Sequence, residues 1–190
     1  MAVEDKRGAV LQAMMELITE HGFHGTAMSM VAKRAGVAAG TIYHYFESKE
    51  EVINQLYGEV MQRVGLALVQ EDSNKGSIKD RFFRYYTNIY HYYIQHPDEF
   101  RFLEQYTNSP YTSQLAREEN GKAFEPVLLF LQQGIELGVL RPLELRMMMA
   151  LVHGHVISLA KLHLSDNNLP VTQEQLEQAA QSCWDGVRIN

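Results

Sequence analysis

The stretch from Thr26 to Lys49, TAMSMVAKRAGVAAGTIYHYFESK, constrains the fold more than any other part of the sequence. Its pattern predicts a short helix over about residues 28–35, a tight turn at Gly36-Val37, and a second short helix over about residues 39–46. One side of each predicted helix is apolar, through Val31, Ala32, Ala35, Ile42 and Phe46. Two helices joined by a glycine-containing turn, the second with a polar face at its start, are typical of the helix-turn-helix that enters a DNA groove.

The preceding segment supplies the cover that this pair needs, because two such short helices cannot bury enough surface alone. Residues 4–20 carry apolar side chains at helical spacing, and Gly22 follows as the expected end of this helix. The apolar positions are Val10, Met14, Leu17 and Ile18. We therefore predict a DNA-binding domain over residues 1–47, with the helix-turn-helix at about residues 27–46.

The rest of the chain predicts only further helices. Ser48, with Glu51 three residues later, has the pattern of a capping box and opens a linking helix over residues 48–69. The polar segment QEDSNKGS at residues 70–77 marks a connection. Beyond it, caps and prolines predict helices over Ile78–His96, from Pro97, from Thr112 or Ser113 with a break near Ala123 caused by Pro126, from Pro142 to about Leu164, and from Thr172 to about Val187. No strand-like alternation persists, so we predict an all-α fold with a second, helical domain over residues 48–190.

Charge and composition narrow the class of protein. A hydrophobic share of 46% with 21% charged residues is ordinary for a globular protein. The net charge is −6, and the first 50 residues carry five Lys and Arg against six Asp and Glu, which counts against a non-specific DNA-coating protein. We expect a cytoplasmic protein without a membrane partner: no signal peptide is evident, runs such as Met147–Val152 are too short for a bilayer, and Cys183 is a lone cysteine.

Three short motifs carry a family resemblance. The runs A-K-R-A-G-V, G-T-I-Y-H-Y-F and S-K-E resemble the N-terminal domain of the TetR family of transcriptional regulators. The resemblance covers about residues Glu4–Met61; beyond them it consists only of a helical domain of suitable length. It implies a homodimeric, ligand-responsive protein that binds double-stranded operator DNA, usually as a repressor, and that needs no cofactor.

The second helix of the motif is the expected reading element. Gly40 would let the backbone approach DNA closely, and Thr41 offers a hydroxyl and a methyl group to base edges. The resemblance implies that Tyr43 and Lys49 contact phosphates and that His44 and Tyr45 make variable base or phosphate contacts. The full predicted set is Ser29, Ala39, Gly40, Thr41, Tyr43, His44, Tyr45 and Lys49. We expect two such heads to bind half-sites about 34–36 Å apart.

An aromatic helix over residues 78–96 is the candidate wall of a ligand pocket. Its tyrosines offer both apolar surface and hydroxyl groups, which suits a small aromatic or lipophilic effector that releases the DNA. The predicted lining is Phe83, Tyr86, Tyr90, Phe102, Tyr106, Phe124, Leu128 and His153. An aromatic stripe at this spacing is equally compatible with a solid core.

The last two predicted helices are apolar around more than one face, so each needs two packing partners. We expect the second partner to be another subunit, and the resemblance favours a two-fold, four-helix interface. The residues assigned to it are Val152, Val156, Leu159, Leu176, Ala180 and Trp184. The alternative is that both faces belong to the core of a single chain.

Two other classes of protein stay open, an all-α enzyme and a helical scaffold that binds another protein. The histidines and carboxylates of the C-terminal part could serve acid–base chemistry, but no H-E-x-x-H, G-x-S-x-G or phosphate-binding glycine loop occurs. His21 and His24 lack a third ligand nearby, so we expect no metal site. A scaffold would leave Tyr43 and Lys49 without a role.

Overall fold

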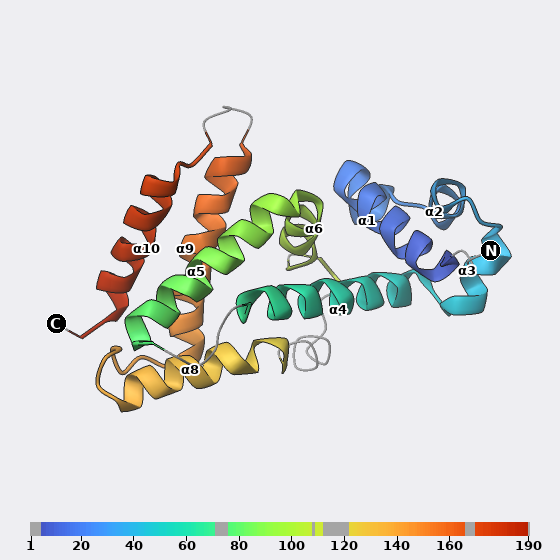
Figure 1. The fold of residues 1–190 in the computed structure, drawn as a ribbon. Helices are drawn as coiled ribbons and strands as arrows, with labels where there is room; N and C mark the ends of the chain where they lie inside the picture. The colour runs from blue at the N-terminus through green and yellow to red at the C-terminus, as the bar shows by residue number, and fades with distance from the viewer. Residues whose placement is uncertain (1–4, 71–75, 108, 112–121, 166–169, 190) are drawn as a thin grey trace. The chain divides into compact units, whose positions relative to one another are not determined.

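A computed structural model of the protein describes residues 5–70, 76–107, 109–111, 122–165 and 170–189. Apart from one isolated bridge between Leu140 and Arg188, every regular element in these ranges is a helix, which confirms the all-α prediction. The elements are α1 (Lys6–Gly25), α2 (Met28–Ala35), α3 (Ala39–Tyr45), α4 (Lys49–Leu68), α5 (Ile78–Gln95), α6 (Pro97–Thr107), the 3-10 helix η1 (Lys122–Phe124), α8 (Glu125–Glu136), α9 (Leu145–Leu164) and α10 (Gln173–Val187) (Figure 1). The expected helix start at Thr112 or Ser113 and most of the 70–77 connection lie outside the described residues.

The chain divides into two compact units. The first unit combines Met1–Gln62 with Pro97–Asn120, and the second combines Arg63–His96 with Gly121–Asn190. The division between Gln62 and Arg63 falls within helix α4, so this helix contributes residues to both units. These units differ from a division at residue 47, because most of α4 and all of α6 pack with the N-terminal helices.

Two glycines with positive φ shape the N-terminal helices, Gly22 within α1 and Gly36 after α2. Gly36 follows α2 in the left-handed region, with φ 68°, and the amide of Val37 donates to the Ala32 carbonyl at 3.0 Å. This is the conformation that ends a helix with least strain when the residue is glycine. Gly22, with φ 71°, interrupts α1 where the sequence predicted its end. The bounds of α2 and α3 agree with the predicted ones to within one residue.

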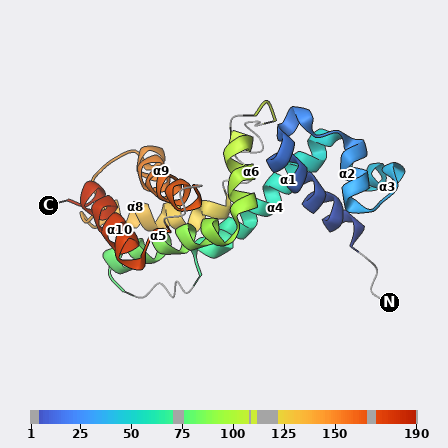
Figure 2. The same ribbon diagram turned by 90° about the horizontal axis from the view of Figure 1, so that it is seen from above.

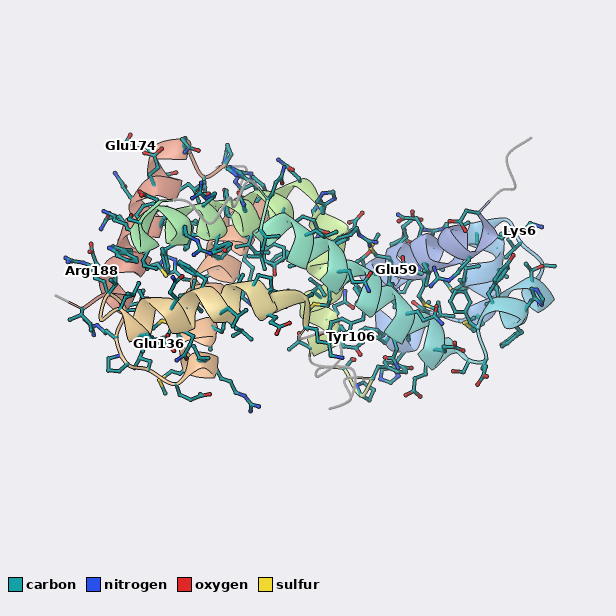
Figure 3. All side chains as sticks on the ribbon, turned by 60° about the horizontal axis from the view of Figure 1, so that its bottom comes forward. Lys6, Glu59, Tyr106, Glu136, Glu174 and Arg188 are labelled. Carbon is teal, nitrogen blue, oxygen red and sulfur yellow. The ribbon has the colours of Figure 1, made fainter. Side chains whose placement is uncertain are left out.

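Helix α6 joins the first unit through its aromatic face. The ring of Phe102 lies 6.2 Å from that of Phe23 in α1, and Tyr106 stacks on Tyr57 of α4 at 3.9 Å. The Tyr106 hydroxyl also donates to Oδ1 of Asn54 at 3.0 Å. These contacts place α6 beside α1 and α4, where Figure 3 labels Tyr106.

Helix α5 is the centre of the second unit, where it packs against α8, α9 and α10 (Figures 1 and 2). Its first turn is closed by a capping box between Ser77 and Asp80, and α10 begins with another between Thr172 and Gln175. Helix α9 begins at Leu145 rather than at Pro142, because the Glu144 side chain accepts from the Arg146 amide and so caps the helix there.

Substitution of Gly36 by alanine tests the turn. A Cβ at φ 68° is strained, so we expect Gly36→Ala to lower the free energy of unfolding by about 1 kcal/mol in urea titration. Gly40→Ala is the matched control in the same unit: its Cβ would enter open space on a helix, and we expect stability to rise by up to about 1 kcal/mol. Equal effects of the two substitutions would contradict this account of the turn.

Candidate nucleic-acid interface and interior cavity

Helix α3 presents a polar and aromatic face to solvent. Tyr43 is 56% exposed and Tyr45 41% exposed, and His44 between them is also exposed. On the opposite side Ile42 and Phe46 are almost completely buried and hold the helix against the unit. The predicted reading face is outward because the two large aliphatic or phenyl side chains, Ile42 within α3 and Phe46 directly after it, both point inward.

The start of α3 leaves room for a close approach. Ala39 and Gly40 are exposed, and no atom lies within 4 Å of the position that a Cβ on Gly40 would occupy. Thr41 is half-buried beside them, and Ser29 of α2 is exposed. The structure thus leaves these four predicted residues on or beside the accessible surface of the helix pair.

Lys49 has an internal partner. Its ammonium donates to the backbone carbonyl of Phe23 at 2.6 Å, which ties the start of α4 to the turn that ends α1. Partial burial lowers the pKa of Lys49, because the charged form loses hydration. A lysine ammonium has three hydrogens, so this bond leaves two for a second acceptor.

Both arginines near the motif are engaged in ion pairs. Arg34 of α2 donates to Glu16 and Glu20 of α1, and Arg7 donates to Glu59 of α4. The pair raises the pKa of Arg34 and lowers that of Glu20. Counting charges along the sequence could not show this pairing, because the partners lie far apart in the chain.

The second unit contains a partly open apolar cavity of about 40 Å³. Its lining residues come from four helices, α4, α5, α8 and α9, and from η1: Leu68, Phe82, Tyr85, Tyr86, Ile89, Phe124, Val127, Phe130, Leu131, Met149, Val152, His153 and Val156. Tyr86, Phe124 and His153 belong to the predicted ligand set. Val152 and Val156, which sequence reasoning assigned to a dimer interface, face this cavity instead.

The other five predicted pocket residues are not among those that line this cavity. Phe102 and Tyr106 belong to the first unit, because α6 packs against α1 and α4. The ammonium nitrogen of Lys79 lies 5.3 Å from the ring centre of Phe83. The hydroxyl of Tyr90 contacts His163 of α9. Leu128 is half-buried on α8 and is not among the described lining residues.

Three tyrosine–histidine contacts join α5 to α9. The hydroxyls lie 2.6 Å from His155 Nδ1 for Tyr86, 2.7 Å from His163 Nδ1 for Tyr90, and 2.6 Å from His153 Nε2 for Tyr93. Burial raises the pKa of Tyr86 and lowers that of His155, so both groups favour the neutral form. Sequence reasoning missed His155 and His163; the available signal was a helix rich in tyrosines whose buried hydroxyls need partners.

Four of the six residues assigned to the dimer interface are buried inside the chain itself. Val156, Leu176, Ala180 and Trp184 are buried within the single chain, where the Trp184 ring lies 5.3 Å from that of Phe82. Val152 and Leu159 are half-buried. The large exposed apolar side chains of α9 are instead Met147, Leu151 and Leu162.

Helix α9 also meets the length and hydropathy criteria of a membrane span, with a mean hydropathy of 1.3 over an 18-residue window. It is the one helix in the described part of the chain that does so, although no uninterrupted apolar run in the sequence is long enough. Core helices of soluble proteins pass the same test, and one side of α9 packs against α5.

Comparison with known proteins decides the family. A model of bacterial regulatory proteins of the tetR family matches residues 10–56, and a model of a tetracyclin repressor-like C-terminal domain matches residues 77–188. The chain belongs to the TetR family. It is a DNA-binding transcription regulator, which confirms the resemblance seen in the helix-turn-helix. TetR-family regulators bind DNA and act as dimers, and the relatives of this chain are regulators rather than enzymes.

Individual relatives extend this likeness to the whole chain. An HTH-type transcriptional regulator of Haemophilus influenzae is 24% identical over 98% of each chain. A solved TetR-family structure from Vibrio parahaemolyticus is 29% identical, covers 98% of this chain and 100% of that one, and superposes with a TM-score of 0.84.

Two further relatives concern fatty acids. The fatty acid metabolism regulator protein of Bacillus subtilis is 36% identical over 38% of this chain and only 37% of its own length. The structure of the regulator FadR from Bacillus subtilis, solved in complex with stearoyl-CoA, is 20% identical with a TM-score of 0.71, and covers 94% of this chain and 95% of that one. At that identity the likeness shows the fold alone.

Proposed function

We propose that this TetR-family chain is a homodimeric cytoplasmic repressor that binds an operator through α3 and leaves it when a lipophilic effector occupies the second unit. In this proposal residues 1–47 contact DNA together with Lys49, and the rest of residues 48–190 bind the effector and the second subunit. The exposed face of α3, held from beneath by Ile42 and Phe46, supports the proposal most directly.

The exposed residues of α3 leave room for DNA to approach and offer a hydrogen-bond donor to it. Gly40 leaves space for the DNA backbone, and the Tyr43 hydroxyl is a neutral donor to phosphate. Few cations are available beside them, because Arg7 and Arg34 already have carboxylate partners. Two or three cationic contacts per head give a slope of log K against log salt of about −4 to −5 for a dimer.

Tyr43→Phe tests the proposed phosphate contact. Loss of a hydrogen bond to a charged group costs about 1.5–3 kcal/mol, so we expect operator affinity to fall by about tenfold or more. The measurement is a gel-shift titration on a duplex selected by the wild-type protein from a random library. The fold should be unaffected, because the side chain is largely exposed. Unchanged affinity would contradict the assignment of Tyr43, and failure of the wild-type protein to select any sequence would contradict the DNA-binding proposal.

The exposed apolar side of α9 supports a subunit interface there. Met147, Leu151 and Leu162 recur at helical spacing, and exposed Gly154 and Ser158 between them would let a second helix approach closely. A two-fold axis beside α9 would bring the same face of two chains together. The buried residues of α10 would then support the interface from within the chain rather than form it.

Two leucines of similar exposure test this interface. Leu151 is 51% exposed on α9, and Leu129 is 63% exposed on α8. We expect Leu151→Glu to convert the dimer to monomer in sedimentation at micromolar concentration, because two like charges would meet near the axis without hydration. Leu129→Glu should stay dimeric. Dimers of equal stability in both variants would place the interface elsewhere.

The apolar cavity supports a lipophilic effector, although its volume is too small for a ligand as it stands. Pockets for ligands of drug size occupy roughly 300–1,000 Å³, so binding would require α5 and α9 to separate. The Tyr–His contacts would then open, and their hydroxyl and imidazole groups could bind a polar group of the ligand. The stearoyl-CoA bound to the Bacillus subtilis FadR suggests an acyl chain as the first compound to test.

An acyl-CoA series tests the effector class. We expect long-chain acyl-CoA to release the protein from its selected operator, whereas CoA without an acyl chain should not, because the cavity has almost no polar lining. Val152→Phe should lower the response at least tenfold by filling the cavity, while Leu137→Phe on the surface should not. Release by CoA itself, or no effect of any acyl chain, would contradict an acyl effector.

A further inference from the structure

We infer that Arg34 and Arg7 are positioning residues that fix the helix-turn-helix on its supporting helices, and that they are not phosphate contacts. This inference rests on the proposed operator binding. In this account few cations of the first unit contact DNA, because some of them bind carboxylates of the protein itself.

Arg34 of α2 is hydrogen-bonded to two glutamates of α1, Glu16 and Glu20, in a cluster that we call the fork. Its Nη1 lies 2.9 Å from Glu20 Oε1 and 3.1 Å from Glu16 Oε2, and its Nη2 lies 2.9 Å from Glu20 Oε2. Glu16 and Glu20 are one helical turn apart, so both carboxylates present to the same guanidinium. Paired N–H donors matched to a carboxylate fix orientation as well as distance, which a lysine cannot do.

Arg7 makes the corresponding connection between α1 and α4. Its Nη1 donates to Glu59 Oε1 at 2.6 Å and its Nη2 to Gln55 Oε1 at 2.7 Å. The guanidinium carbon also lies 5.8 Å from the ring centre of Phe46, the residue that ends α3. Figure 3 labels Glu59 on α4. The Arg7 side chain of α1 thus contacts both α4 and the residue that ends the reading helix.

A phosphate would meet an unfavourable field at Arg34. The two carboxylates outnumber the single guanidinium, so the cluster carries net negative charge. Three of its five N–H donors are used by the carboxylates. A phosphate that approached the other two donors would be repelled by the net negative charge of the cluster. Lys33, its neighbour in the chain, is exposed and has no ion pair within the described residues. Arg34 and Lys33 therefore form a matched pair for an experiment: Arg34 is bound to carboxylates of the protein, and Lys33 is exposed and so available to a DNA phosphate.

The first test compares Arg34→Gln with Lys33→Gln on the selected operator, over a range of salt concentrations. Loss of one phosphate contact makes the slope of log K against log salt shallower by about 0.9 per subunit, and we expect this for Lys33→Gln. Arg34→Gln should lower affinity about fivefold and leave the slope unchanged. Arg34→Lys, which keeps the charge but not the fork, should behave like Arg34→Gln. A slope change in Arg34→Gln equal to that in Lys33→Gln would overturn the inference.

Substitution of Glu16 and Glu20 tests the inference in a second way, because charge alone and the fork predict opposite changes in DNA affinity. Glu16→Gln with Glu20→Gln removes two negative charges from the DNA-binding unit, so charge alone predicts tighter binding. If the fork positions α2, the double variant should instead bind the operator more weakly. Adding Arg34→Gln to it should change affinity less than in the wild-type protein, because the partners are already gone. Tighter binding with a steeper slope would show that Arg34 is a phosphate contact.

Hydrogen exchange separates this inference from the operator proposal. Without DNA, the amides of residues 28–35 should exchange faster in Arg34→Gln and in the double glutamine variant, but not in Lys33→Gln. Should the wild-type protein select no operator, the proposed function fails, and the exchange rates still decide whether the fork holds α2. Equal exchange in all the variants and the wild-type protein would refute it.

Discussion

Burial of Ile42 and Phe46 is the contact on which DNA recognition by this chain depends. Helix α3 has seven residues, too few to be stable in water by its own hydrogen bonds. Its place is therefore set by two apolar side chains on one side and by the left-handed turn at Gly36 before it. The exposed residues on its other side, Gly40, Tyr43, His44 and Tyr45, are left accessible to a partner.

Local structure was predictable because its causes are local. Gly36, Ser77, Pro97 and Thr172 each fix a boundary through their own conformational preference or a bond to a residue three positions away. The helix-turn-helix was predictable for the same reason, since its apolar spacing and its turn lie within one short stretch. Ser48 was predicted only in part: it caps α4, but the Glu51 side chain accepts from the amide of Glu47 rather than that of Ser48.

Long-range pairing was not predictable from one sequence. The spacing of Phe102 and Tyr106 showed an aromatic face but not its partner, and the face packs on α1 and α4 instead of α5. In the same way Trp184 and Val156 showed that α9 and α10 need partners on more than one side, and the partner of both residues is their own chain. The pairing of Arg34 with Glu20 was also not predictable, because its two residues lie on different helices.

The central claim is that two copies of the first unit hold one duplex at two places a helical turn apart. Sedimentation of the protein with its selected operator measures this directly, through the number of chains in each complex. The account predicts two chains on one duplex, with protected half-sites about 34–36 Å apart. A complex with a single chain, saturating at one protected half-site, would contradict it.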